Sequence, residues 1–180
     1  DLAGHTAGGQ LPVFAQRAAP IQVSAWGYAL TTGLPEMDVL FTEHTFCPLT
    51  FPWISEKAYY LPALIPQQPP GAGPPHRPRR PGPLRFGYGG SPAKLNPVIL
   101  TRWAELLRAR PDATLECQYL GFEQQAVQLS ILRELDIDPR RVTFGPMMVH
   151  AEHLEHVAAW DVALDAWPHT GGVTTLDATM

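Results

Sequence analysis

The chain of 180 residues is long enough for one large domain or two small ones. Hydrophobic residues make up 45% and charged residues 17% of it, and no apolar run reaches the roughly 18 residues that a membrane-spanning helix needs. Thirteen basic and seventeen acidic residues give a net charge of −4, which disfavours nucleic-acid binding because that binding depends on phosphate neutralisation. The composition therefore predicts a globular protein without a membrane span and disfavours a nucleic-acid-binding role.

Cysteine usage and the two ends indicate where the protein belongs. Cys47 and Cys117 are too few for a disulfide framework and form no Cys-x-x-Cys pair, so we expect a reducing, cytoplasmic location. The first residues show neither a methionine nor a signal-peptide pattern, and residues 175–180 resemble the first turns of a helix without a stop signal. Both ends look cut, so we expect a segment of a longer protein.

A proline-rich stretch divides the chain. Eight of the twenty prolines lie between Pro66 and Pro83, where they prevent helix and ladder hydrogen bonds and predict a polyproline-like linker. Residues 1–65 precede it and residues 84–180 follow it. A proline-rich ligand for SH3-type domains is the less favoured alternative for this stretch.

A strand, a loop and a helix recur four times in residues 84–180. Strands are expected at 84–88, 114–119, 141–144 and 162–164, and helices at 98–110, 122–135, 151–159 and from about 173. Asn96 and Pro97 suit the N-cap and first position of the first of these helices. The alternation predicts a doubly wound parallel sheet with helices on both faces.

Ligands of such sheets bind beyond the carboxyl ends of the strands, where helix N-termini offer free N–H groups. The loops 89–95, 145–150 and 166–172 all fall at this edge and contain glycine or proline. We therefore expect a phosphate or nucleotide crevice there. The less regular residues 1–65 carry strand-like segments at 20–23, 37–42 and 59–61 and are interpreted as the end of an α/β domain whose beginning is missing.

Short motifs recur in a fixed order over nearly the whole chain. They are D-L-x-G-H-T at 1–6, V-F-A-x-R at 13–17, A-P-I-Q-V at 19–23, W-G-Y at 26–28, T-T-G-L-P at 31–35, S-E-K at 55–57, A-K-L-N-P at 93–97, D-V-A-L-D at 161–165 and G-G-V-T-T-L-D at 171–177. In this order the motifs resemble the catalytic region of the O-GlcNAc transferase and SPINDLY family.

The resemblance implies a two-lobed GT-B glycosyltransferase fold, with both lobes incomplete in this chain. Residues 1–65 would be the C-terminal part of the first, acceptor-side lobe, residues 66–83 the linker, and residues 84–180 the first part of the nucleotide-sugar-binding lobe. Tetratricopeptide repeats are expected upstream in the parent protein. We expect this segment alone to be inactive.

The implied activity is transfer of N-acetylglucosamine from UDP-GlcNAc to Ser or Thr hydroxyls of proteins, by a metal-independent inverting mechanism without a cofactor. SPINDLY-type fucose transfer from GDP-fucose is one alternative. A degenerate, inactive module that binds a nucleotide or a protein is another. An unrelated Rossmann-type oxidoreductase is disfavoured because Gly87-Tyr-Gly-Gly90 lacks the third glycine of the dinucleotide motif.

The resemblance also implies roles for single residues. Lys94 matches the lysine that contacts the donor diphosphate and would stabilise the departing nucleotide, which makes it the one catalytic candidate. His153 matches the histidine that packs on the base, and Asp177 the carboxylate that accepts hydrogen bonds from the ribose hydroxyls. The complete donor-side set is Ser91, Lys94, Met148, His153, Gly172, Val173, Thr174 and Asp177. The set on the sugar and acceptor side is His5, Gly27 and Tyr28.

Several residues depart from the family pattern or leave alternatives. Ala29 and Leu30 replace Pro-Gly, and the Gly89-Gly-Ser91 loop lacks two amides found in relatives, which leaves the donor and turnover open. His150, His153 and His156 could share one helical face, so a zinc site is weighed and disfavoured because no carboxylate or cysteine completes it. No catalytic base is assigned, because the histidine most often discussed for this role lies upstream of residue 1.

Overall fold

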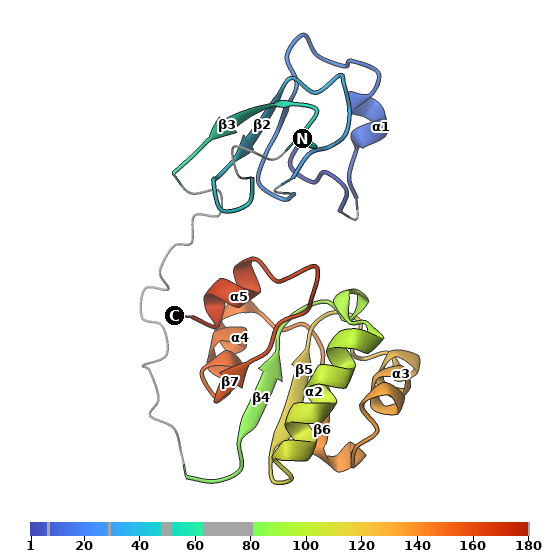
Figure 1. Ribbon diagram of the computed structural model, residues 1–180, viewed down its shortest axis with the longest axis vertical. Helices are drawn as coiled ribbons and strands as arrows, with labels where there is room; N and C mark the ends of the chain where they lie inside the picture. The colour runs from blue at the N-terminus through green and yellow to red at the C-terminus, as the bar shows by residue number, and fades with distance from the viewer. Residues whose placement is uncertain (7, 29, 48–51, 63–80, 180) are drawn as a thin grey trace. The chain divides into compact units, whose positions relative to one another are not determined.

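The computed structural model describes residues 1–6, 8–28, 30–47, 52–62 and 81–179. The chain divides into two compact units, Asp1–Pro66 and Gln67–Met180, each drawn with its own sheet in Figure 1. Of the expected linker, residues 66–80 lie outside the described ranges. Within those ranges, none of the helices combines the length and the apolar character that crossing a bilayer requires.

The first unit contains a three-stranded sheet in the order β1-β2-β3, with every strand parallel to its neighbour. The strands are β1 (Val23–Ser24), β2 (Val39–Thr42) and β3 (Lys57–Tyr60), so each strand-like segment seen in the sequence overlaps one strand, although β1 shares only Val23 with its segment and β3 begins two residues earlier than expected. On β2, Leu40 and Thr42 are buried and alternate with more exposed neighbours, as one covered sheet face requires. The short helix α1 (Leu11–Phe14) was not expected.

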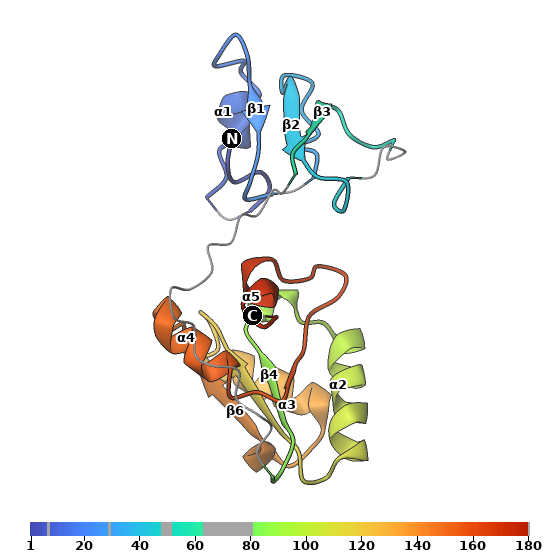
Figure 2. The same ribbon diagram turned by 90° about the vertical axis from the view of Figure 1, so that its left-hand side faces the viewer.

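The second unit contains a four-stranded parallel sheet in the order β6-β5-β4-β7. Its strands are β4 (Arg85–Tyr88), β5 (Thr114–Gln118), β6 (Val142–Gly145) and β7 (Val162–Ala163), and its helices are α2 (Pro97–Ala109), α3 (Gln125–Leu135), α4 (His150–Val157) and α5 (Val173–Asp177). Short 3-10 turns, η1 (Pro92–Lys94) and η2 (Pro139–Arg141), were not expected. Figure 2 shows α2 and α4 on opposite faces of the sheet, which confirms the predicted doubly wound arrangement.

Helix α2 begins where the sequence predicted. The Asn96 side chain accepts a hydrogen bond from the Ile99 backbone N–H at 3.1 Å, and Pro97 occupies the first helical position. Its buried residues recur at the spacing of one helix face: Leu100, Trp103, Ala104 and Leu107. This face packs on the sheet beside α3, and an aromatic contact of 5.1 Å between ring centroids joins Trp103 to Tyr88 of β4.

Helix α3 begins three residues later than predicted. Gly121 adopts a φ of +104°, which turns the chain out of helical conformation, and Gln124 is still extended. Phe122 lies in this turn and is completely buried, with its ring 6.2 Å from Tyr88 and 5.9 Å from Phe144. Residues 122–124, predicted as the first turn of this helix, are therefore non-helical, because the Phe122 ring packs into the core there.

We expect Gly87→Ala to destabilise the second unit. An added Cβ at Gly87 would overlap the ring of Trp160, so the ring or the strand must shift, at a cost of roughly 1–3 kcal/mol in the free energy of unfolding. Urea denaturation would measure this cost. Gly145→Ala is the matched control, because its Cβ would meet only Gln118 Cγ at an ordinary 3.6 Å. Equal stability of the two variants would contradict the packing described here.

Candidate functional site

A pocket of about 220 Å³ lies at the carboxyl ends of β5 and β6. Parallel pairing brings these ends to one edge of the sheet, and the β6–α4 loop, α4 and α5 close the pocket around them. Its lining residues are Gln118, Tyr119, Met147, Met148, His150, His153, Val173, Thr174 and Asp177. The structure thus brings together Met148, His153, Val173, Thr174 and Asp177, which the sequence predicted as donor-side residues. The other four lining residues, Gln118, Tyr119, Met147 and His150, were not predicted to bind the donor.

The Asp177 carboxylate is the buried anionic group of this pocket. The residue is 5% exposed and is the last residue of α5. Its Oδ1 lies 3.3 Å from His150 Nε2, and its Oδ2 lies 3.6 Å from His153 Nε2. Two imidazoles therefore lie beside a carboxylate, a group whose oxygens can accept hydrogen bonds from hydroxyl groups of a ligand.

His153 presents a largely buried imidazole to the pocket. Burial lowers its pKa below the ordinary value of 6.5, the Asp177 carboxylate opposes this shift, and His150 and His156 add to it. The ring is consequently neutral at pH 7 and offers a flat, weakly polar face. Gly89 leaves room for it, because a Cβ there would lie 3.1 Å from His153 Cε1.

The three helix-face histidines of α4 do not converge. His150 and His153 face Asp177, whereas His156 Nδ1 lies 2.9 Å from Glu116 Oε1 on β5. His156 therefore pairs with β5 while 42% of its side chain stays exposed. Among the residues that the structure describes, no group of three His, Cys, Asp or Glu side chains is placed to hold a metal ion.

The loop in front of α5 is fixed by Asp165. Its Oδ1 accepts hydrogen bonds from the Ala166 and Gly171 backbone N–H groups at 2.7 and 2.9 Å, and its Oδ2 accepts one from the Thr175 hydroxyl at 2.8 Å. A Cβ at Gly171 would overlap Thr175 Oγ1, so the threonine hydroxyl would have to move away from it. One carboxylate thus closes the loop that leads into the pocket.

Lys94 is tied to the same loop. Its Nζ donates to the Thr170 carbonyl oxygen at 2.9 Å, and the Asn96 amide donates to the Trp167 carbonyl oxygen at 2.6 Å. Burial lowers the pKa of Lys94, and the nearby Asp165 carboxylate opposes that shift. The ammonium group therefore lies beside the segment that leads into α5, although it does not line the pocket itself.

Two other predicted donor-side residues also lie outside the pocket lining. Ser91 caps the 3-10 turn η1, where its hydroxyl accepts a hydrogen bond from the Ala93 N–H at 3.3 Å. Gly172 is the N-cap of α5 and directly precedes the lining residues Val173 and Thr174.

The predicted acceptor-side residues lie together in the first unit. His5 Nε2 is 3.0 Å from the Thr32 carbonyl oxygen, and the His5 and Tyr28 rings meet edge to face at 5.2 Å. Gly27 packs so closely on residue 2 that a Cβ would overlap the carbonyl oxygen of Leu2. Ala29, which the sequence singled out as a departure from the family pattern, lies outside the described residues.

Glu56, from the S-E-K motif, is a buried carboxylate that holds the Thr31-Thr32 turn. It accepts hydrogen bonds from the Thr31 hydroxyl at 2.7 Å, from the Thr32 N–H at 2.7 Å and from the Thr32 hydroxyl. Burial raises its pKa, but the hydrogen bonds from Thr32 and Thr31 outweigh burial and leave the pKa below its ordinary value. The motif therefore has a structural role beside His5, which the sequence alone did not show.

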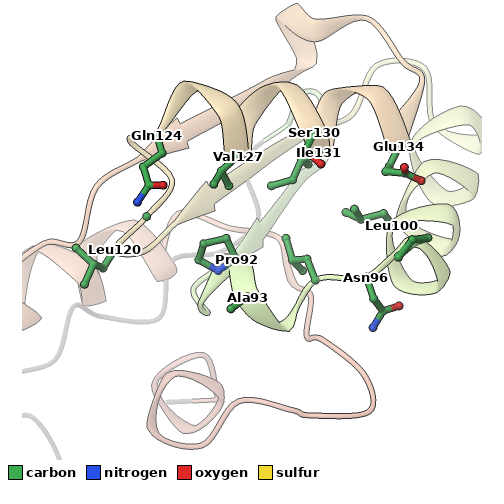
Figure 3. Close-up of a pocket in the computed structure, with 13 residues that line it drawn as sticks. Pro92, Ala93, Asn96, Leu100, Leu120, Gln124, Val127, Ser130, Ile131 and Glu134 are labelled. Carbon is green, nitrogen blue, oxygen red and sulfur yellow. The ribbon is translucent and has the colours of Figure 1, made fainter. Parts of the chain in front are cut away.

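A larger pocket, of about 530 Å³, lies between η1, the start of α2 and α3 (Figure 3). Apolar side chains such as Pro92, Leu100 and Val127 form much of its wall, and Gln124 and Glu134 lie along α3. None of the predicted site residues lines it. Size alone therefore does not identify the functional site.

Both the sequence and the fold of the chain are similar to those of known proteins. No protein-family model matches the chain. It is 33% identical over 190 residues to a Petunia hybrida protein named probable UDP-N-acetylglucosamine–peptide N-acetylglucosaminyltransferase SPINDLY, and 27% identical to the Arabidopsis thaliana protein SEC of the same named activity. A solved mutant of the Thermobaculum terrenum O-GlcNAc transferase matches with a TM-score of 0.85 at 30% identity.

These matches cover 97–99% of this chain. The chain in turn spans about a fifth of the length of the curated relatives and 35% of the solved transferase. The fold is that of the GT-B glycosyltransferases, as the sequence predicted. Over nearly its whole length, the chain is similar to one segment of proteins of the O-GlcNAc transferase and SPINDLY family.

Acid should destabilise the second unit through His153. Because the folded-state pKa of His153 is depressed, the unfolded state takes up this proton first, so stability falls as the pH drops below 6.5 towards the folded-state pKa. We expect His153→Asn to reduce the fall in the free energy of unfolding between pH 7 and acid, measured by urea denaturation. The exposed His169→Asn variant is the control. If the free energy of unfolding of both variants depended on pH as it does in wild type, the description of His153 as a buried neutral imidazole would be contradicted.

Proposed function

We propose that the protein acts as a nucleotide-sugar-dependent protein O-glycosyltransferase, with the donor bound by the second unit. The observation that carries this proposal is the single pocket that contains Met148, His153 and Asp177, the three residues for which the family resemblance implies contacts to the nucleoside. In this proposal residues 1–65 belong to the acceptor-side lobe and residues 84–180 to the donor lobe.

The chemistry of the pocket suits a nucleoside. The neutral His153 ring provides a flat face against which a base can pack, and the Met148 side chain adds an adaptable apolar contact. The buried Asp177 carboxylate can accept hydroxyl hydrogens of a ribose diol, because a carboxylate oxygen can accept more than one hydrogen bond. Base and ribose would thus be held by different residues of one cavity.

The diphosphate would extend from this pocket along the loop that precedes α5. Gly172, Val173 and Thr174 lead from the pocket into that loop, and the Lys94 ammonium is hydrogen-bonded to Thr170 within it. Ser91, at the start of the η1 turn, belongs to the same proposed donor side. As the glycosidic bond breaks, negative charge develops on the leaving diphosphate, and a positioned ammonium stabilises it without a metal ion.

For the donor and acceptor, we propose UDP-GlcNAc and protein Ser or Thr hydroxyls, with inversion at the sugar carbon by direct attack. The support is the activity in the names of the SPINDLY and SEC relatives. His5, Gly27 and Tyr28 would serve the sugar and acceptor side. GDP-fucose remains the second donor candidate, because six of the relatives are SPINDLY proteins and Leu30 and Gly89–Ser91 depart from the pattern of relatives. Upstream tetratricopeptide repeats and a cytoplasmic location stay predictions.

Isothermal titration with UDP, GDP and the matching nucleosides tests the donor site. We expect one nucleotide to bind, with Asp177→Asn weakening nucleotide and nucleoside alike by about tenfold through the lost charge on the ribose contact. Lys94→Ala should weaken only the diphosphate form by a similar factor, because the ammonium contacts no part of the nucleoside. Which nucleotide binds names the donor class.

Lys57→Ala, an exposed lysine of the first unit, is the control for loss of one positive charge. Absence of binding to either nucleotide would overturn the donor-site proposal and leave a degenerate interaction module. Equal losses for nucleoside and nucleotide in Lys94→Ala would remove Lys94 from the diphosphate contact.

A further inference from the structure

Gln118 is the last residue of β5 and lines the 220 Å³ pocket. Side chains alternate along a strand, so Gln118 shares a face with Glu116, while Cys117 points into the core on the other face. Glu116 contacts His156 of α4, which shows that α4 covers this face. The Gln118 carboxamide therefore lies under the α4 side of the sheet, at the edge where the pocket opens.

The Gln118 carboxamide is buried without a partner. The residue is 2% exposed, and neither Nε2 nor Oε1 has a hydrogen-bond partner. Within the described part of Gln67–Met180, the only other buried side-chain atom in this condition is His153 Nε2, which lines the same pocket. By contrast, the Nε2 of the equally buried Gln22 donates to the Phe14 and Glu36 carbonyl oxygens at 2.9 Å, and only its Oε1 lacks a partner.

Buried amides are nearly always hydrogen-bonded in folded proteins, so a buried and unpaired carboxamide in a pocket indicates a ligand contact. A carboxamide presents a donor and an acceptor side by side. A phosphate would satisfy only Nε2, because it offers no donor to Oε1, and the Asp177 carboxylate in the same pocket repels an anion. The complementary group is a lactam edge, N–H beside C=O, which uracil and guanine both carry.

We infer that Gln118 binds the lactam edge of the donor's nucleobase and thereby determines which bases the site accepts. The inference rests on the proposed function, because it places the nucleoside in this pocket. The base would lie with one face towards the His153 ring and its edge towards Gln118, while the ribose reaches Asp177. No other residue assigned to the site supplies a side-chain amide.

The test compares Gln118→Met with wild type by isothermal titration. Methionine matches glutamine in length and shape but removes both hydrogen-bonding atoms. The ligands are UDP, GDP and the same two nucleotides with a methyl group on the lactam nitrogen. For the nucleotide that binds, we expect Gln118→Met to lose roughly tenfold or more in affinity, and the methyl group to cost wild type much more than it costs the variant. The UDP and GDP arms identify which base is bound.

Gln125→Met, the same change at an exposed position of α3, is the matched control and should bind as wild type. If the penalty for the methylated base is equal in wild type and Gln118→Met, Gln118 does not contact the lactam and the inference is overturned. In that case Asp177→Asn still weakens binding if the proposed function holds. Absence of binding by wild type would overturn both.

Thermal unfolding without nucleotide separates a ligand contact from a structural role. Removing two unpaired polar atoms from a buried site should leave the Tm of Gln118→Met equal to or above that of wild type. A clear drop in Tm together with unchanged nucleotide affinity would mean that the carboxamide serves the fold and would contradict the inference. Gln22→Met, which removes hydrogen bonds to two carbonyl groups, should lower the Tm and serves as the comparison.

Discussion

The parallel pairing of β5 with β4 on one side and β6 on the other is the constraint on which the candidate site depends. It aligns Cys117 with Tyr88 and with Phe144, so that the three strands end at one edge and the loops that follow them meet there. Residues far apart in the chain, such as Gln118, His153 and Asp177, consequently line one cavity. Without this register the same side chains, which come from β5, α4 and α5, would not meet in one cavity.

Polar groups at this edge are used in two different ways. Asp165 has its carboxylate fully engaged with Ala166, Gly171 and Thr175, and it fixes the loop in front of α5. Gln118 lies buried in the pocket with neither side-chain polar atom paired. A rigid loop beside unpaired buried groups is the arrangement expected of a preformed ligand site, where the protein carries a small loss of stability so that the ligand finds its contacts in place.

Most of the second unit could be predicted from the sequence. The alternation of strands and helices and the Asn96 cap are local patterns, and they placed every main element to within a few residues. The start of α3 was predicted too early because burial of Phe122 and the left-handed Gly121 are decided by packing. The family resemblance named five of the residues that line the pocket, but it did not name Gln118, because only three-dimensional burial distinguishes an unpaired glutamine from an exposed one. The structural roles of Glu56 and of the His156–Glu116 pair were missed for the same reason, since their partners are distant in sequence.

The central claim is that the pocket between β5, α4 and α5 holds the nucleoside of a sugar nucleotide. A crystal structure of the protein with UDP or GDP tests it most directly. The account predicts density for the base between His153 and Met148, with the ribose hydroxyls on Asp177. Density in the larger pocket beside Pro92 and Val127, with the smaller one left to solvent, would contradict it.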